Sequence, residues 1–221
     1  MMGAIQPTGI QIKELAECAD DGPVVMINML KFRETTTAGD PGRAAYERYG
    51  RGVMPILGDL DGAPALRRLA GLADIVLHFA PPPGDGVSDP RTRRLLSILN
   101  RSSLPRCLVY VSTSGVYGDC GGASIDETRP VRPHNARAKR RVDAEDNLRN
   151  WGKRTGVRVS ILRAPGIYAE DRMPEERVRK GLPALRPDED IYTNHIHAED
   201  LARLAVHAAL RGAPGRVYHA V

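Results

Sequence analysis

The fold is indicated by residues 74–112, which read DIVLHFAPPPGDGVSDPRTRRLLSILNRSSLPRCLVYVS. Residues 74–80 and 106–112 are short, continuous apolar runs, a pattern typical of strands buried in a parallel sheet. Between them, Asp89 and Pro90 predict the start of a helix over 89–99, because aspartate caps free N–H groups and proline fits the first turn. Strand, helix and strand in this order are the unit of a parallel sheet covered by helices.

The same alternation continues on both sides of this stretch. Toward the C-terminus we expect a long loop, a charged helix, a strand, a second helix and a short strand, at 113–134, 135–155, 157–163, 197–210 and 217–220. Toward the N-terminus we expect a strand, a helix and a short helix, at 24–32, 43–57 and 63–69. The prediction is an α/β fold of Rossmann-like type, with a mostly parallel sheet and helices on both faces. Ligands bind beyond the carboxyl ends of strands in such sheets, so function is expected after residues 80, 112 and 163.

Composition narrows the class of protein. Of the 221 residues, 42% are hydrophobic and 27% charged, and the net charge is +5. The apolar runs are too short to span a membrane, and aromatic residues at 5% are too few for a nucleic-acid stacking surface. We expect no membrane or nucleic-acid partner, and a small-molecule substrate. The three cysteines have no metal-ligand spacing and no secretory signal is visible, which predicts reduced thiols in a cytoplasmic protein without a metal.

Three segments carry a family resemblance: VSTSGVYGD at 111–119, RAPGIY at 163–168 and NHIHAEDLA at 194–202. Together they resemble the extended short-chain dehydrogenase/reductases, the family of NAD-dependent epimerases and dehydratases. Gly58-Asp59-Leu60 resembles the family's Gly-Asp-Leu segment, and HFAPP at 78–82 is similar to an atypical bacterial branch. The resemblance covers residues 58–221.

The resemblance implies a site with NAD or NADP as cofactor. By its motif positions the catalytic residues are Thr113, Asn135 and Lys139, where Thr113 polarises the substrate oxygen and Lys139 orients the nicotinamide ribose. The implied cofactor-binding residues are Asp59, Leu60, Ala80, Pro81, Ser112, Lys139 and Pro165. The implied substrate-binding residues are Tyr117, Ile167 and His197.

Asn135 departs from the family pattern. It stands where the family has the tyrosine of Tyr-x-x-x-Lys, while Lys139 keeps the expected spacing. The tyrosine is a general acid/base, whereas an asparagine amide can only donate or accept a hydrogen bond.

The N-terminal part departs more strongly. The Gly-x-x-Gly-x-x-Gly loop that brings backbone N–H groups to a pyrophosphate is not found in the sequence. Residues 1–57 instead resemble half of a small ferredoxin-like dimeric α/β-barrel domain, through GPVVMINMLKF at 22–32 and GRAAYERYG at 42–50. We therefore predict two segments of different origin, 1–57 and 58–221. The strand and helix of the first could fill the place of the family's first strand and helix, leaving the sheet incomplete or rebuilt there.

Three functional hypotheses remain open. The chain could be an NAD(P)-dependent oxidoreductase or nucleotide-sugar epimerase/dehydratase-like enzyme, a catalytically inactive relative that binds a nucleotide or a protein, or a non-functional gene fusion. Plainer roles also remain open: Ser112 and Thr113 as a polar strand end, Lys139 as part of a solvated basic face, and Tyr117 as a packed aromatic. A homodimer is compatible with the sequence.

Overall fold

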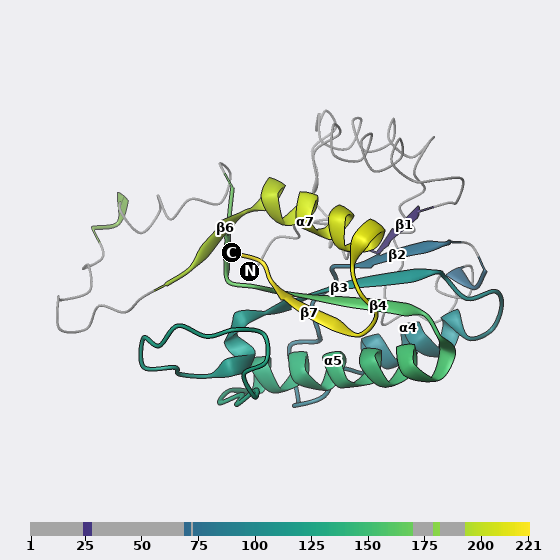
Figure 1. The fold of residues 1–221 in the computed structure, drawn as a ribbon. Coiled ribbons are helices and arrows are strands. Elements are labelled where there is room, and N and C mark those ends of the chain that lie inside the picture. The colour runs from purple at the N-terminus through teal and green to yellow at the C-terminus, as the bar shows by residue number, and fades with distance from the viewer. Residues whose placement is uncertain (1–23, 28–68, 72, 170–178, 182–192) are drawn as a thin grey trace, which may run out of the picture.

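The computed structural model describes residues 24–27, 69–71, 73–169, 179–181 and 193–221 (Figure 1). Its centre is a five-stranded parallel sheet in the order β1-β2-β3-β4-β7. The strands are β1 (Val24–Ile27), β2 (Ile75–His78), β3 (Cys107–Thr113), β4 (Arg158–Ala164) and β7 (Arg216–His219). The predicted Rossmann-like α/β class is confirmed.

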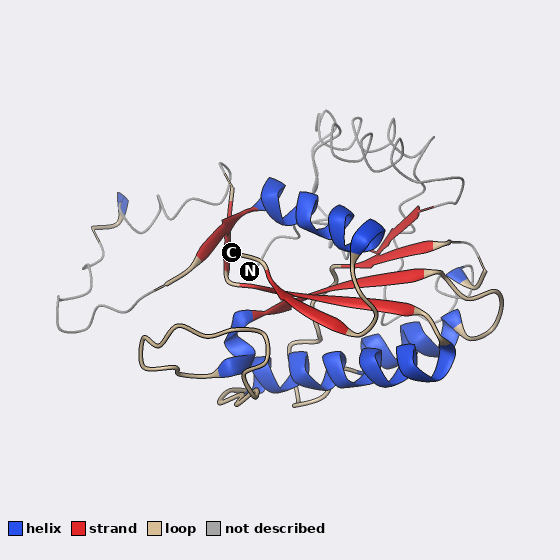
Figure 2. Ribbon diagram, viewed as in Figure 1, coloured by secondary structure: helices blue, strands red, loops and turns tan. Residues whose placement is uncertain are grey.

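Helices cover both faces of the sheet, as Figure 2 shows. The helices α4 (Pro90–Leu99) and α5 (Ala136–Thr155) lie on one face, and α7 (Ala198–Arg211) lies on the other. Alternate residues of β3 serve the two faces: Leu108 and Tyr110 pack with α4 and α5, whereas Val109 and Val111 pack with α7. This is the period-two alternation of a strand, and because both faces are covered, the strand reads as a continuous apolar run.

Helix α5 begins and ends on residues suited to those positions. The Asn135 side chain accepts a hydrogen bond from the Ala138 N–H at 2.8 Å, and Gly156 ends the helix in the left-handed conformation at φ 78°. The core side of the helix carries Leu148 and Trp151, both fully buried. Each such side chain contributes roughly 1.5–3 kcal/mol by leaving water. This burial holds a very polar helix against the sheet.

Strand β1 is the outermost of the described strands and pairs with β2, with Val24 in register with Ile75. In the classic doubly wound order the first strand lies next to the fourth. Residues 24–27 therefore take the place beside β2 that the first strand has in that order, where the sequence predicted an incomplete or rebuilt strand. The rest of the predicted strand at 28–32 and the predicted helices at 43–57 and 63–68 lie outside the described residues.

Three short elements were not expected from the sequence. The loop predicted over 113–134 contains a 3₁₀ turn, η2 (Ser114–Tyr117), and the strands β5 (Gly166–Tyr168) and β6 (His195–His197) form a separate parallel pair. Gly166 packs under the His195 ring, since a Cβ there would lie 2.6 Å from the ring carbon Cδ2. Short pairs of this kind depend on such non-local contacts and leave little periodic signal. No helix in the described part of the chain is long and apolar enough to cross a membrane.

Candidate functional site

The carboxyl edge of the sheet holds a buried ion pair between α5 and β4. Arg163 donates from Nη2 to Glu145 Oε2 at 2.6 Å and from Nε to Oε1 at 3.2 Å, and both side chains are at most 4% exposed. Ser112 also donates its hydroxyl hydrogen to Glu145 Oε1, at 2.5 Å. Burial by itself lowers the pKa of Arg163, but the hydrogen bonds and charge of Glu145 outweigh it, and the net shift is upward. The guanidinium of Arg163 therefore keeps its charge, and its contacts with Glu145 tie the helix to the ends of β3 and β4.

Tyr117 extends this network to the C-terminal strand. Arg163 Nη1 donates to the phenol oxygen of Tyr117 at 2.7 Å, and the same oxygen is in hydrogen-bond contact with His219 Nε2 at 2.6 Å. Burial raises the pKa of Tyr117, and the Arg163 hydrogen bond opposes that rise. Glu127 accepts the backbone N–H of His219 at 3.0 Å. The hydrogen-bonded chain crosses from β3 and η2 to β7, and it keeps the phenol of Tyr117 engaged on both sides.

His78 lies in a second buried network, at the end of β2. Its Nε2 is 3.0 Å from Thr92 Oγ1, and the Thr92 hydroxyl donates to Asp89 Oδ2 at 2.7 Å. Since the Thr92 hydrogen is committed to Asp89, His78 must be the donor through Nε2. Burial, followed by the positive charge of Arg141, lowers the pKa of His78 to about 3. The imidazole is therefore neutral at physiological pH.

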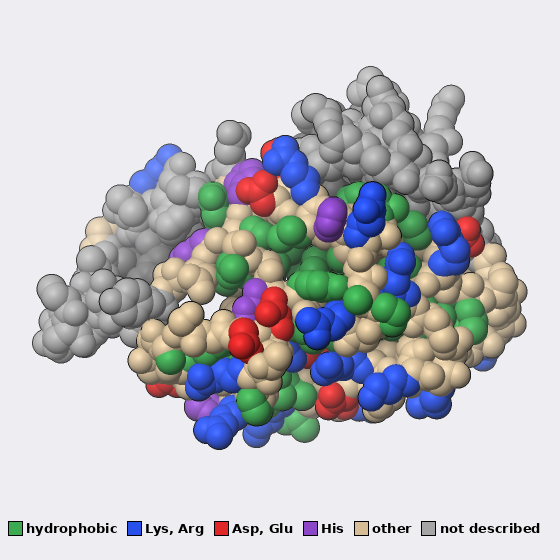
Figure 3. All heavy atoms as spheres, viewed as in Figure 1, with side chains coloured by type: hydrophobic (Ala, Val, Ile, Leu, Met, Phe, Trp, Pro, Cys, Tyr) green, Lys and Arg blue, Asp and Glu red, His purple; other side chains and the backbone are tan. Residues whose placement is uncertain are grey.

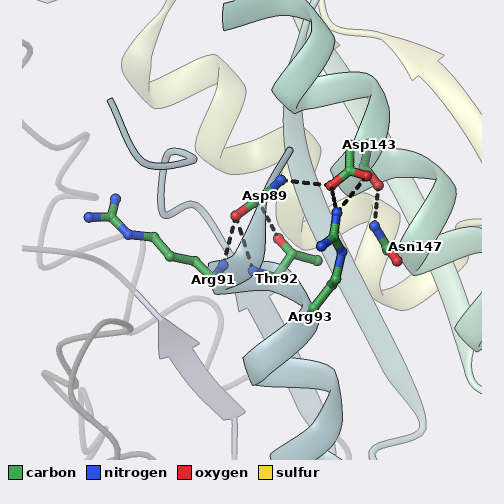
Figure 4. Close-up of polar contacts among 6 residues, drawn as sticks. All are labelled: Asp89, Arg91, Thr92, Arg93, Asp143 and Asn147. Carbon is green, nitrogen blue, oxygen red and sulfur yellow. Dashed lines mark hydrogen bonds and ion pairs between the residues drawn. The ribbon is translucent and has the colours of Figure 1, made fainter. Parts of the chain in front are cut away.

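Asp89 also anchors α4 to α5, as the close-up in Figure 4 shows. Its side chain accepts the N–H groups of Arg91 and Thr92, which caps the helix. Its own N–H donates to Asp143 of α5 at 2.6 Å, and Asp143 also accepts from Arg93 at 2.8 Å. The loop after β2 is thereby held next to the first half of α5.

The three predicted catalytic residues come from β3 and α5, two elements that pack together at the carboxyl edge. Thr113 ends β3 and its Oγ1 accepts the Gly115 N–H at 3.2 Å. Asn135 caps α5 with its side-chain oxygen, and Lys139 is exposed one turn later. Thr113 and Asn135 thus have local capping roles in addition to any chemical one. Among the described residues, Lys139 forms no ion pair, and its side chain is exposed.

The predicted cofactor residues divide into three groups. Asp59 and Leu60 lie outside the described residues. Ala80 is fully buried and Ser112 is engaged by Glu145, so both serve the packing of the edge. Pro81 is exposed and Pro165 is half-buried, and these two lie on the loops after β2 and β4.

The predicted substrate residues do not all lie together. Tyr117 is buried in the Arg163 network, whereas Ile167 lies in β5 and His197 caps α7 by accepting the Glu199 N–H at 3.3 Å. His197 borders an open cavity of about 650 Å³ between the β5–β6 pair and α7. Its other lining side chains include Tyr168, His195, Arg203 and His207. The sequence did not single out Tyr168 or Arg203, because only the fold brings β5 against α7.

Metal binding finds no support in this region. No group of three or more His, Cys, Asp or Glu side chains among the described residues could hold a metal ion. His195 and His197 are instead occupied with packing and capping: His195 stacks on Gly166, and His197 meets the Tyr168 ring at 5.2 Å between centroids.

Comparison with known proteins agrees with this geometry. A family model described as the NAD dependent epimerase/dehydratase family matches residues 34–220. The match begins within the segment that the sequence assigned to a different origin, so the boundary at residue 58 stays a prediction. The human dTDP-D-glucose 4,6-dehydratase is 26% identical over 165 residues, which is 66% of this chain and 47% of that protein. The chain therefore spans about half the length of this relative.

Solved structures show the same fold. The dTDP-glucose 4,6-dehydratase DesIV from Streptomyces venezuelae, a double mutant with NAD and DAU bound, has a TM-score of 0.72 at 22% identity, covering 95% of this chain and 69% of its own. RMD from Pseudomonas aeruginosa, complexed with NADPH, has a TM-score of 0.66 at 21% identity, covering 89% and 75%.

Proposed function

We propose, from the premise that the chain belongs to the NAD-dependent epimerase/dehydratase family, that it binds NAD or NADP and acts as an oxidoreductase or epimerase/dehydratase-like protein on a small nucleotide-linked substrate. The observation that carries the proposal is the arrangement at the carboxyl edge. Thr113 ends the central strand β3, and the exposed Lys139 lies on the helix that packs against it. The relatives named above, a dTDP-D-glucose dehydratase and structures with NAD or NADPH bound, support the choice of cofactor and substrate class.

Some of the proposed cofactor contacts lie among the described residues. Lys139 is an exposed cation suited to hydrogen bonding a ribose. Pro81 is exposed and follows the carboxyl end of β2, and dinucleotides bind beyond the carboxyl ends of strands in such sheets, which supports the proposal. Asp59 and Leu60 remain predicted adenine contacts. When bound, the dinucleotide would accept a hydride from the substrate and could give it back. The chain would hold the ribose through Lys139 and polarise a substrate oxygen through Thr113.

A second candidate function is nucleotide or protein binding without turnover. The observation that favours it is the position of Asn135, whose side-chain oxygen is used to cap α5. An amide has no proton to exchange near neutral pH, so the usual acid/base step lacks its residue. Two phenols lie close to Thr113 in sequence, and both are buried: Tyr110 accepts a hydrogen bond from Arg141, and Tyr117 is held by Arg163 and His219.

The remaining predictions belong to the proposal as well. We propose two segments, residues 1–57 and 58–221, a cytoplasmic location, a small-molecule substrate and a homodimer. The reduced thiols expected there are compatible with the structure, since Cys107 and Cys120 are both free and Cys107 is buried.

The first experiment is a titration of the purified protein with NADH and with NADPH, followed by cofactor fluorescence and calorimetry. Micromolar binding of either cofactor supports the proposal, and no binding at millimolar cofactor contradicts it. If binding is found, Lys139→Ala should weaken it about tenfold, as expected for the loss of a charged hydrogen bond. Lys153→Ala is the matched control, because Lys153 is an exposed lysine in the last turn of the same helix.

The second experiment separates the enzyme from the inactive binder. Wild type, Thr113→Ala and Asn135→Tyr are compared in a screen of nucleotide sugars for cofactor-dependent turnover. Turnover by the wild type that falls in Thr113→Ala supports the enzyme. Cofactor binding without turnover in wild type and in Asn135→Tyr supports the binder.

A further inference from the structure

The first two turns of α5 are strongly basic. Residues 136–141 read ARAKRR, with no acidic residue in the first turn of the helix. Arg137, Arg140 and Arg141 are spaced three and four residues apart, so their side chains leave neighbouring positions of one helix side. In Figure 3, Lys and Arg side chains gather along the lower margin of the molecule, where Figure 1 places α5.

Arg140 and Arg141 donate hydrogen bonds only to neutral acceptors among the described residues. Arg140 Nη1 donates to the Gly86 carbonyl at 2.7 Å, and Arg141 Nη1 donates to the Tyr110 hydroxyl at 2.9 Å and the Val111 carbonyl at 2.7 Å. Arg140 is only 8% exposed and Arg141 9%, and the Nε atom of each is buried without a hydrogen-bond partner in the described part of the chain. Buried charges are costly unless an opposite charge compensates them.

Two of the three acidic residues farther along α5 are already engaged by other arginines. Asp143 accepts two hydrogen bonds from Arg93 at 2.9 and 2.8 Å, and Glu145 binds Arg163 through both oxygens. Among the described residues, no carboxylate therefore forms an ion pair with Arg140 or Arg141.

The charges of the two buried arginines also act on Arg137. The pKa of Arg137 is lowered, first by burial and then by the charges of Arg141 and Arg140. An anion bound among them would relieve this repulsion and would also meet the positive end of the helix dipole.

We propose that Arg137, Arg140 and Arg141 form a binding site for the phosphate or diphosphate group of a nucleotide. Guanidinium groups match phosphate oxygens in geometry, often with two parallel hydrogen bonds. The buried pair would supply fixed donors, and the exposed Arg137 would close over the anion. None of these arginines is among the predicted cofactor or substrate residues, so the site goes beyond the proposed function.

The test uses Arg137→Gln, because Arg137 is exposed and its loss leaves the buried contacts of the helix intact. Arg154→Gln is the matched control: it makes the same charge change at an exposed position of α5, roughly 25 Å away along the helix axis. Wild type and both variants are titrated by calorimetry with inorganic pyrophosphate, ADP and adenosine. Equal thermal unfolding midpoints of the three proteins confirm that the fold is unchanged.

We expect pyrophosphate and ADP to bind the wild type, about tenfold weaker binding of both by Arg137→Gln, and less than about twofold change in Arg154→Gln. Absence of pyrophosphate binding by the wild type overturns the proposal. Equal weakening of binding in the two variants also overturns it, because that result would indicate general charge attraction. Binding of adenosine as tight as that of ADP overturns it as well. Because pyrophosphate requires no dinucleotide site, this result is separate from the NADH and NADPH titrations.

Discussion

The neutral, buried imidazole of His78 makes the stability of the fold depend on pH in a way that can be calculated. The pKa of His78 falls from 6.5, its ordinary value, to about 3 in the folded protein, because of burial and the charge of Arg141. A group with a depressed folded pKa binds more protons when unfolded, so stability is fully present above pH 6.5 and is lost as the pH falls toward 3. Between pH 7.5 and pH 5.0, this one residue should lower the free energy of unfolding by about 2 kcal/mol.

The measurement is urea unfolding of the wild type and His78→Gln at a series of pH values, followed by the fluorescence of Trp151, the single tryptophan. Glutamine keeps an N–H that can reach Thr92 but does not titrate. The variant should be less stable at pH 7.5, yet its free energy of unfolding should fall by about 2 kcal/mol less than that of the wild type on acidification. His134→Gln, at an exposed position, is the control, and its free energy of unfolding should change with pH as that of the wild type does.

Parallel pH profiles for wild type and His78→Gln would refute the reasoning. They would mean that His78 is charged in the folded protein, or that acidification opens the region around β2 and α4 before the imidazole is protonated. The histidine control separates a specific effect of the buried ring from the general effect of removing a histidine.

Three further predictions concern the network, the loop and the helix cap. Glu145→Gln should lower the free energy of unfolding by roughly 3–5 kcal/mol, because it leaves Arg163 buried without a counter-charge, and adding Arg163→Met should recover part of the loss in urea unfolding. Gly118→Ala should lower the free energy of unfolding by roughly 3 kcal/mol in the same assay, since φ is 72° and a Cβ would lie 2.4 Å from a backbone carbonyl oxygen. Gly121→Ala should cost only about 1 kcal/mol, because φ is 58° but the space around a Cβ is open. Equal losses in the two variants would contradict the steric argument. Asn135→Ala should cost about 1 kcal/mol by removing the cap, while Asn135→Ser should retain most of the stability; equal thermal unfolding midpoints for the two variants would count against a capping role.

The structure changes how the candidate site is understood. The sequence placed Ser112 and Tyr117 at the site by resemblance, and the structure places both in the Glu145–Arg163 network, where their polar atoms are already bonded. Such a network rigidifies the carboxyl edge on which a ligand would rest. Lys139, by contrast, is exposed, and its role toward the cofactor stays a prediction.

The sequence by itself determined the class of fold and most of its central elements. The strands at 75–78, 107–113 and 158–164 were predicted within one or two residues, and so were α4, with its capping residue Asp89, and α5. These features are local: apolar runs, helix caps and turn residues act through neighbours in the chain, so their signal lies in the order of residues.

Only the tertiary structure decided which side chains meet. Glu145 and Arg163 are separated by a helix end and a turn, and Tyr117 and His219 by more than a hundred residues, yet each pair is in hydrogen-bond contact. The same holds for the β5–β6 pair and for the neutral surroundings of the buried arginines. These arrangements depend on how strands are ordered in the sheet and on which faces are buried, and burial sets both the cost of a charge and its pKa.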